Sequence, residues 1–272
     1  MKNLLRTLLL ASVLALAGAA SAASAAPSAP SGSSKASVLV IGGAMMSGDH
    51  FADSTLATMR LHYAGCHHVA LVIHASHPAE RDAMEAQLQK AFAHLGGIEA
   101  KSLHRFDAAG ALDLLARADG IFVGGGETFV LLAELHRTGQ LAVIQERVRA
   151  GVPYAGSSAG ANVAGMLIGT TNDFPVAEIP TRTALGIFPA TINPHHPEPA
   201  TRADYEGRAA KIKHYLKFNR AETVLGLANR AMVRLHEGRV ALTSGVAWIY
   251  RTDSARELKI GEAVPELGAA GK

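Results

Sequence analysis

Short apolar segments that end in glycine or polar residues recur along the chain and constrain its fold more than any other feature. Four of them predict buried strands, at 37–41, 69–73, 120–123 and 152–155. Each segment is rich in residues that suit strands and is followed at once by a turn, as at Gly42-Gly43 and at Gly124-Gly125-Gly126. Uninterrupted apolar runs of this length are typical of parallel strands that are covered on both faces.

Helical patterns separate these strands. Apolar residues recur at intervals of three and four in 80–95, 108–118, 129–138 and 141–150. The alternation of strand and helix predicts a mostly parallel sheet with helices on both faces. After Asn162 the pattern gives way to a loop-rich stretch at 170–202. A helix over 208–217 follows, and then four short strands at hairpin spacing, at 223–227, 231–235, 239–243 and 247–250. The expected fold class is therefore α/β, with short C-terminal strands.

The first 25 residues have the pattern of a secretory signal peptide. Lys2 and Arg6 precede an apolar run over 7–16, and small residues then offer cleavage points after Ala22 and Ala25. The apolar run is shorter than the roughly 20 residues of a membrane span, and no later stretch is long and uncharged enough to be one. We therefore expect an exported protein, periplasmic or secreted, with no membrane span.

The rest of the chain predicts one domain. Residues 26–35 are rich in Ala, Pro, Ser and Gly and are expected to form a flexible linker, and 36–265 a single α/β domain. Cys66 is the only cysteine, so no internal disulfide can form and the core must stabilise the fold. In its setting before a strand, Cys66 is expected to be a buried small side chain rather than a catalytic thiol.

The charge balance argues against nucleic-acid binding. Without Lys2 and Arg6 the basic count falls from 26 to 24 against 23 acidic residues, which leaves a net charge near +1. Aromatic residues make up 5% of the chain, so no platform for stacking single strands is indicated.

A G-x-S-x-G motif at 156–160 lies where a strand should turn into a helix, which is the context of a nucleophile elbow. The same pattern also suits a plain structural turn, because Gly, Ser and Ala are abundant here. In the functional interpretation Ser158 exposes its hydroxyl, and Ala159 at the start of the helix offers its N–H to a developing oxyanion. The turn Gly124-Gly125-Gly126 closes another strand, and the carboxyl ends of neighbouring parallel strands face one crevice, so its N–H groups could meet the same substrate carbonyl. Ser157 is a weaker candidate for the nucleophile.

Residues suited to activate this serine follow it. Asp173 and His195 lie 15 and 37 residues after Ser158. A nucleophilic serine needs a base to take its proton, and the base needs a partner to orient it. His196 could substitute for His195, although adjacent residues usually point in different directions. The histidine pairs 67–68 and 74–77 lack nearby cysteines or clustered carboxylates, so we expect no metal site and no cofactor.

Four blocks of sequence resemble the peptidase E (aspartyl dipeptidase) family in order and spacing. They are GGGETFVLL at 124–132, SAGAN at 158–162, TTNDFP at 170–175, and LGIFP at 185–189 running into INPH at 192–195. The resemblance spans roughly Ser37 to Tyr250 and extends to the related cyanophycinases. It implies a fold like that of class I glutamine amidotransferase domains. It also implies removal of an N-terminal aspartate from a short peptide, without a metal.

The resemblance also implies roles for individual residues. Ser158 would be the nucleophile, His195 the base and Asp173 the residue that orients the base, while Gly125 and Ala159 would form the oxyanion hole. Arg208 matches weakly an arginine in the family and could bind the substrate aspartate as a bidentate partner. Arg182 and Arg202 compete with it for this role.

Two positions depart from the family pattern. Glu127 follows the three glycines where the family commonly has Asn, and it could bind the free α-ammonium group of a substrate. Asn229 aligns with a glutamate that is sometimes proposed as the third triad member.

These observations favour a serine exopeptidase that releases N-terminal Asp from small peptides. A cyanophycinase-like hydrolase of β-linked aspartyl-arginine material is the nearest alternative, and Glu127 would favour it by attracting a cation. A catalytically impaired binding protein of the same fold is the non-enzymatic alternative, motivated by Glu127 and Asn229. The sequence specifies a small peptide as the partner but no oligomeric state.

Overall fold

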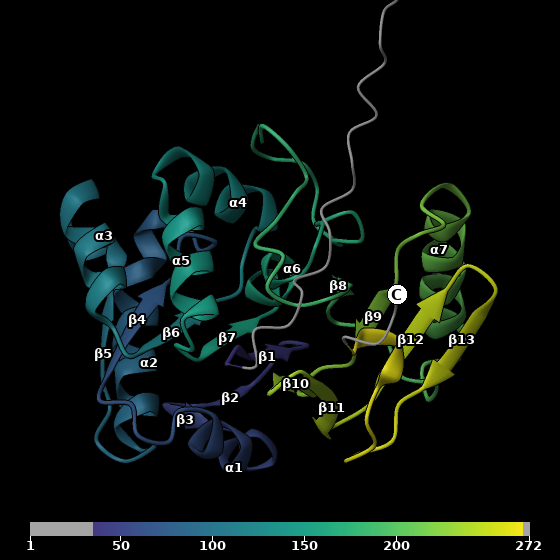
Figure 1. Ribbon diagram of the computed structural model, residues 1–272, viewed down its shortest axis with the longest axis horizontal. Coiled ribbons are helices and arrows are strands. Elements are labelled where there is room, and N and C mark those ends of the chain that lie inside the picture. Colours follow the sequence, from purple (N-terminus) through teal and green to yellow (C-terminus); the bar gives the residue numbers. More distant parts are fainter. Residues whose placement is uncertain (1–34, 269–272) are drawn as a thin grey trace, which may run out of the picture.

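The computed structural model describes residues 35–268. The signal peptide expected at 1–25, and all of the expected linker except Lys35, lie outside these residues. Within 35–268, no helix has the length and apolar character needed to cross a membrane. Two sheets lie side by side, with helices around the larger one (Figure 1).

The larger sheet has seven strands: β1 (Ser37–Ile41), β4 (His68–Val72), β5 (Glu99–Ser102), β6 (Gly120–Val123), β7 (Tyr154–Ser157), β10 (Met232–His236) and β11 (Arg239–Ser244). They run in the order β11-β10-β1-β7-β6-β4-β5. The five strands from β1 to β5 in this order are mutually parallel, and β10 and β11 add to them antiparallel. The prediction of a mostly parallel sheet is confirmed.

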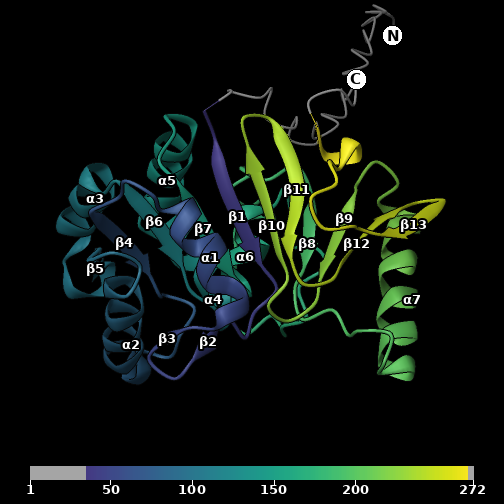
Figure 2. The same cartoon turned by 90° about the horizontal axis from the view of Figure 1, so that it is seen from below.

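Helices cover both faces of this sheet: α1 (Asp53–His62) and α2 (Arg81–Ala93) on one side, and α3 (Ala108–Arg117), α4 (Thr128–Arg137), α5 (Gln140–Arg149) and α6 (Ala159–Ala164) on the other. Alternate residues of β1 point into two separate cores, because successive side chains on a strand face opposite ways. Leu39 packs in the core that contains Phe92 of α2, and Val38 in the core that contains Leu132 of α4. Figure 1 shows the larger sheet between α1 on one side and α5 on the other, and Figure 2, seen from below, shows α1 in front of the sheet.

A second sheet forms the other end of the molecule: β8 (Thr191–Asn193), β9 (Val224–Leu227), β12 (Ala247–Arg251) and β13 (Ser254–Glu257), with α7 (Arg202–Phe218) packed against it. Its order is β13-β12-β9-β8, and β8 and β9 are parallel. The four expected C-terminal strands are therefore divided between two sheets. The chain leaves β9 and crosses to the larger sheet, where β10 and β11 form the one hairpin among those four strands.

Shorter elements complete the described chain: β2 (Met46–Ser47), β3 (His50–Phe51), and the 3-10 turns η1 (Pro78–Glu80), η2 (Leu103–Arg105) and η3 (Pro265–Leu267). Strand β5 is not predicted from the sequence, because its Glu-Ala-Lys-Ser segment alternates exposed and buried residues instead of forming an apolar run. Helix α7 begins at Arg202, earlier than the predicted 208, since its first turn is polar and exposed.

Candidate active site

Ser158 stands at the tight turn from β7 into α6. Its backbone has a φ of +55°, which non-glycine residues adopt only when the surrounding structure imposes it. Gly160 allows this turn: a Cβ there would lie 2.2 Å from the carbonyl oxygen of Val123 on β6. The Tyr154 hydroxyl donates to the Gly160 carbonyl at 2.7 Å and holds α6 against the strand. The motif at 156–160 is thus a nucleophile elbow in geometry.

The side chains of Ser158 and His195 meet. Ser158 Oγ lies 2.8 Å from His195 Nε2, within hydrogen-bond distance for proton transfer to a general base. Ser157 is 7% exposed at the end of β7 and makes no such contact. The structure therefore brings together the pair that is separated by 37 residues in the sequence.

The end of β1 holds this pair together through its backbone. Three consecutive carbonyl oxygens accept hydrogen bonds from three distant N–H groups: Ile41 from Ser158 at 3.0 Å, Gly42 from His195 at 3.0 Å, and Gly43 from Arg230 at 2.8 Å. Each acceptor belongs to the larger sheet or its following turn, and the last two donors belong to loops of the second sheet. This run of carbonyls fixes the position of one sheet's functional residues relative to the other's.

Gly43 also forms the surface under the His195 ring. Its φ is +111°, and a Cβ at this position would lie 2.2 Å from His195 Cε1. Glycine is required here both by the backbone conformation and by the close approach of the imidazole.

The second ring nitrogen of His195 is bound by an amide. His195 Nδ1 lies 2.6 Å from Oδ1 of Asn229, which follows the end of β9. The prediction that Asp173 orients His195 is contradicted by this geometry, since Asn229 occupies the ring nitrogen and Asp173 bonds elsewhere.

Asp173 caps the first turn of α4. Its Oδ2 accepts the backbone N–H of Thr128 at 2.9 Å and the hydroxyl of Thr171 at 3.2 Å. The first N–H groups of a helix have no partner within the helix, so a carboxylate is favoured there. Because α4 begins just after Gly124-Gly125-Gly126, Asp173 supports the glycine loop beside Ser158 rather than the base.

Two backbone N–H groups lie beside the serine. A Cβ on Gly125 would come within 3.0 Å of Ser158 Cβ, and within the described residues the Gly125 N–H has no hydrogen-bond partner. Ala159 is the first residue of α6, where the N–H has no acceptor within the helix. Glu127 follows the glycine loop. It is exposed, and its carboxylate makes no hydrogen bond or ion pair in the part of the chain that the structure describes.

A polar cavity of about 280 Å³ lies beside the end of β8, two residues before His195. Its lining residues are Gly169, Thr170, Thr171, Asn172, Asn193, Arg208, Lys211, Ile212 and Tyr215. Half-buried Arg208 donates from Nη1 to Asn193 Oδ1 at 3.0 Å, and Asn193 lies two residues before His195. Burial lowers the pKa of the Arg208 guanidinium, an effect that Asp204 partly offsets. Among the described carboxylates, none forms an ion pair with Arg208.

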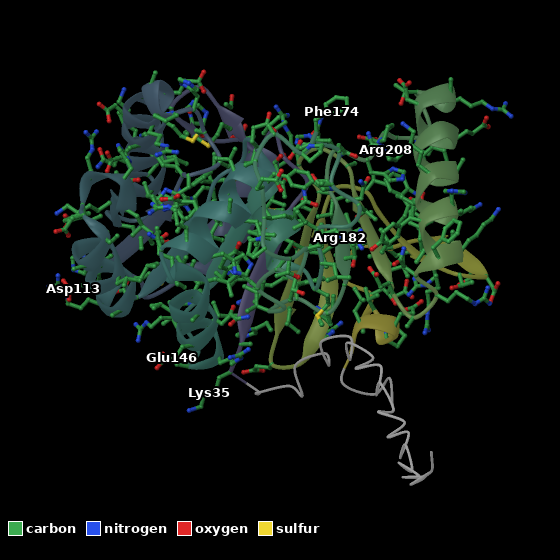
Figure 3. All side chains as sticks on the ribbon, turned by 90° about the horizontal axis from the view of Figure 1, so that it is seen from above. Lys35, Asp113, Glu146, Phe174, Arg182 and Arg208 are labelled. Carbon is green, nitrogen blue, oxygen red and sulfur yellow. The ribbon has the colours of Figure 1, made fainter. Side chains whose placement is uncertain are left out.

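The competing arginines are placed differently. Arg202 is exposed and forms an ion pair with Glu206 one turn along α7, at 2.8 Å. Arg182 is exposed, and Figure 3 shows it nearer the middle of the molecule than Phe174 and Arg208; its charge acts on Tyr215, which lines the cavity. Of the three candidates, Arg208 is the one that itself lines the cavity.

Burial shifts the pKa values of two other side chains that could react, those of His196 and Cys66. His196 is buried, its Nε2 lies 2.9 Å from the Tyr250 hydroxyl, and its ring centroid lies 4.5 Å from that of Trp248. Burial lowers the pKa of His196 to about 4. Burial likewise raises the pKa of the Cys66 thiol to about 11, which disfavours the thiolate. Within residues 35–268, no three His, Cys, Asp or Glu side chains are grouped so as to hold a metal ion.

Comparisons with known proteins show which family the chain belongs to. The model of peptidase family S51 matches residues 38–243. Peptidase E of Streptomyces coelicolor is 34% identical over 236 residues, which cover 85% of this chain and 94% of that protein. A Drosophila melanogaster protein named probable alpha-aspartyl dipeptidase is 42% identical over 147 residues, or 53% of this chain and 61% of that protein. The crystal structure of a peptidase from an acI-B1 Actinobacterium has a TM-score of 0.62 at 17% identity, covering 84% of this chain and 96% of that one.

Proposed function

The chain belongs to peptidase family S51 and is a serine-type dipeptidase, and from this premise we propose that it releases N-terminal aspartate from short peptides. The contact of 2.8 Å between Ser158 Oγ and His195 Nε2, at a strained elbow, carries the proposal. It supports Ser158 as the nucleophile and His195 as the general base.

The reaction that this geometry supports is acyl transfer. Ser158 Oγ attacks the carbonyl carbon of the aspartyl residue while its proton passes to His195 Nε2. The carbonyl π electrons move to the oxygen, where the N–H groups of Gly125 and Ala159 stabilise the negative charge. The C–N bond then breaks, Nε2 gives its proton to the leaving amine, and an acyl-enzyme remains. A water molecule that is deprotonated by the same nitrogen hydrolyses the ester and releases aspartate.

Two charged side chains support a substrate with a free N-terminus and an acidic side chain: Glu127, which follows the glycine loop, and Arg208, which contacts Asn193 two residues before His195. Arg208 is half-buried and forms no ion pair with a described carboxylate, although the charge of Asp204 acts on it at longer range, so a bound aspartate carboxylate would supply a direct ion pair. Glu127 has no partner for its carboxylate in residues 35–268 and suits the α-ammonium group of the same substrate residue. A dipeptide that is bound out of water needs partners for both its side-chain carboxylate and its α-ammonium group.

Hydrolysis of small peptides tests the proposal. The purified protein should cleave Asp-Leu, should cleave N-acetyl-Asp-Leu poorly, and should be labelled at Ser158 by a fluorophosphonate. Absence of Asp-Leu hydrolysis, or equal cleavage of the free and acetylated peptides, would contradict it. Preferential cleavage of β-Asp-Arg would instead support the cyanophycinase-like alternative.

The Arg208→Met variant tests the aspartate pocket. It keeps much of the stem volume and deletes the guanidinium, so kcat/KM for Asp-Leu should fall by about 10²-fold while that for a neutral analogue such as Asn-Leu changes little. Arg202→Met is the matched control, because Arg202 is exposed and paired with Glu206. If Arg202→Met loses the preference for Asp and Arg208→Met keeps it, the aspartate pocket is formed by Arg202 instead.

We also propose that the enzyme acts after export, in the periplasm or outside the cell. The basic, apolar and small-residue succession over 1–25 supports this location. Mass spectrometry of protein from the producing cells should find an N-terminus just after Ala22 or Ala25, and retention of Met1 in exported protein would contradict it.

A further inference from the structure

A larger cavity lies on the side of the seven-stranded sheet where α1 packs. Its volume is about 760 Å³, and it is lined by residues of α1, β10 and β11 and by the segment after β13. Helix α1 starts against the end of β11, where the Ser244 hydroxyl donates to the Ser54 carbonyl at 3.0 Å. Figure 2 shows β10 and β11 beside α1, and in this view no helix of the described chain lies in front of them. The face of these two strands is therefore the floor of the cavity.

The register of the sheet places Arg234 on this floor. Arg234 is paired with Leu39 of β1 on one side and with Ala241 of β11 on the other. Directly opposite residues of neighbouring antiparallel strands point to the same face of a sheet. Leu39 packs in the core that contains Met59 of α1, so Arg234 also points to the side of α1, where it lines the cavity.

The walls of the cavity are mostly apolar. Leu61, in the last turn of α1, is 62% exposed, and Ile260, after β13, is 67% exposed. Both line this cavity, although they lie 199 residues apart in the sequence. A concave surface of this size, with apolar walls and a few polar groups, is the usual form of a small-molecule site.

Arg234 is a cation without a close partner. Its side chain is half-buried, it forms no hydrogen bond or ion pair with residues 35–268, and its Nε is buried without a hydrogen-bond acceptor. Burial lowers the pKa of its guanidinium, an effect that the charge of Glu237 partly offsets at longer range. A guanidinium that is held partly out of water is stabilised most by a carboxylate, which can accept two hydrogen bonds from it.

The other ionisable groups leave the cavity positive. Arg239 lines it and donates to a backbone carbonyl, which does not neutralise its charge. His236 lies 4.0 Å from Glu237, the one acidic residue in the lining. His62 of α1 is buried, and burial together with the charge of Arg234 lowers its pKa to about 3, so it is neutral near pH 7. Two arginines therefore outweigh one glutamate.

The charge of the cavity selects its occupant. Residues 1–34 and 269–272 contain no Asp or Glu, so charge does not favour either segment of this chain. A second copy bound by two-fold symmetry would set one basic cavity against the other, because such a contact joins the same patch of both copies. A molecule that combines an apolar chain with a carboxylate matches both the walls and the unpaired arginine.

We propose that this cavity binds a medium-chain fatty acid, with its carboxylate on Arg234 and its chain along Leu61 and Ile260. The site is separate from the candidate active site. His236 is paired with Ser37 at the start of β1, whereas the Ser158 N–H binds the Ile41 carbonyl at the end of that strand. The proposal goes beyond the proposed peptidase function and does not depend on it.

Equilibrium dialysis of the purified protein against ¹⁴C-decanoate measures this binding. Decanoate should bind with a Kd below about 1 mM, as expected for a ligand of this size. Octanoate should bind about tenfold more weakly, because its chain is two CH₂ groups shorter. Decyltrimethylammonium has a chain of the same length and the opposite charge, and it should not displace decanoate.

Two variants test the contacts. Arg234→Met keeps much of the stem and deletes the guanidinium, so the Kd for decanoate should rise by about tenfold. Leu61→Glu puts a negative charge on the apolar wall and should raise the Kd by about tenfold or more. Arg202→Met and Phe218→Glu are the matched controls, because both residues are exposed and neither lines the cavity. They should leave the Kd within about twofold.

Thermal melting establishes that each variant is folded. Since Leu61 is exposed, Leu61→Glu still tests the site if Arg234→Met does not fold. A Kd for decanoate above about 1 mM, or equal binding by Leu61→Glu and the unaltered protein, would overturn the proposal. A dimer in sedimentation that Leu61→Glu dissociates would make the cavity an interface between copies and would overturn it too. Decanoate binding that Leu61→Glu weakens, in a protein that does not hydrolyse Asp-Leu, would support this site and contradict the proposed function alone.

Discussion

The turns that carry Ser158 and His195 are alike in backbone conformation and differ in what holds them. Both residues have a positive φ, +55° and +52°, and both follow the end of a parallel strand. The turn of Ser158 is closed largely by its own neighbours, since Tyr154 binds Gly160 and Asn162 N–H donates to Ser158 O. The turn of His195 is held by segments remote in sequence, among them Gly42 and Asn229.

Because of this difference, changes in the Ser158 turn and in the His195 turn should affect catalysis in different ways. A change at the elbow should remove the reacting atom and leave the surrounding structure intact. A change near His195 should leave every reacting atom in place but move the base, because the supports of that turn come from two other loops.

Removal of the nucleophile should have the largest effect. Ser158→Ala should lower kcat for Asp-Leu by about 10⁴-fold or more, since the attacking atom is lost, while the melting temperature stays nearly unchanged because a half-buried hydroxyl contributes little to the core. Ser157→Ala is the matched control one residue earlier and should lose far less activity. Equal losses in the two variants would show that the nucleophile is wrongly assigned.

Displacement of the base should have the next largest effect. Gly43→Ala places a methyl group 2.2 Å from His195 Cε1, so the ring must shift and kcat should fall by about 10²-fold. Gly48→Ala is the control: it also has a positive φ, but a Cβ there meets no atom within 4 Å. If Gly43→Ala loses activity while both variants melt at similar temperatures, the loss is due to the displaced His195 ring and not to unfolding. Equal activity of the two variants would mean that the His195 turn tolerates movement.

The smallest effect concerns the residue after the base. His196 is buried with its pKa lowered to about 4, and His62 is buried with its pKa lowered to about 3. Their folded values lie below the unfolded value of about 6.5, so the unfolded state binds more protons and stability should fall as pH drops from about 6.5 toward 4. His196→Phe keeps an aromatic ring and removes one titrating group, so it should lose about 2 kcal/mol less stability than the original protein between pH 7 and pH 5. Chemical denaturation at both pH values measures this difference, and equal losses would contradict the assignment.

Much of the fold could be predicted from patterns within short windows. The strand at 37–41 and that at 120–123 coincide with β1 and β6, and the four helices expected between the strands are present with ends within about two residues. Strand β5 and helix α1 were missed because their stability comes from packing against the sheet and not from an apolar pattern of their own. The division of the C-terminal strands between two sheets was missed as well, since hairpin spacing does not specify which sheet a strand joins.

The candidate site was likewise predicted only in part. The G-x-S-x-G motif and its place between a strand and a helix together located the elbow, because a strained strand-to-helix turn needs glycines at fixed positions in one short segment. The sequence also supplied His195, Gly125 and Arg208, whose surroundings in the structure suit the roles expected of them. It assigned the wrong partner to His195, because Asp173 is nearer in sequence and carries the expected charge.

By itself, then, the sequence determined the parallel sheet, the elbow and the types of side chain that the reaction needs, all of which depend on local periodicity and local steric limits. Tertiary structure decided which side chain reaches which ring nitrogen. Asp173 lies 22 residues from His195 and binds the start of α4, whereas Asn229 lies 34 residues away and contacts the ring. The physical reason is that hydrogen bonds of about 3 Å depend on how β1, β8 and β9 are arranged in space, and that arrangement follows from burial of both sheets as a whole.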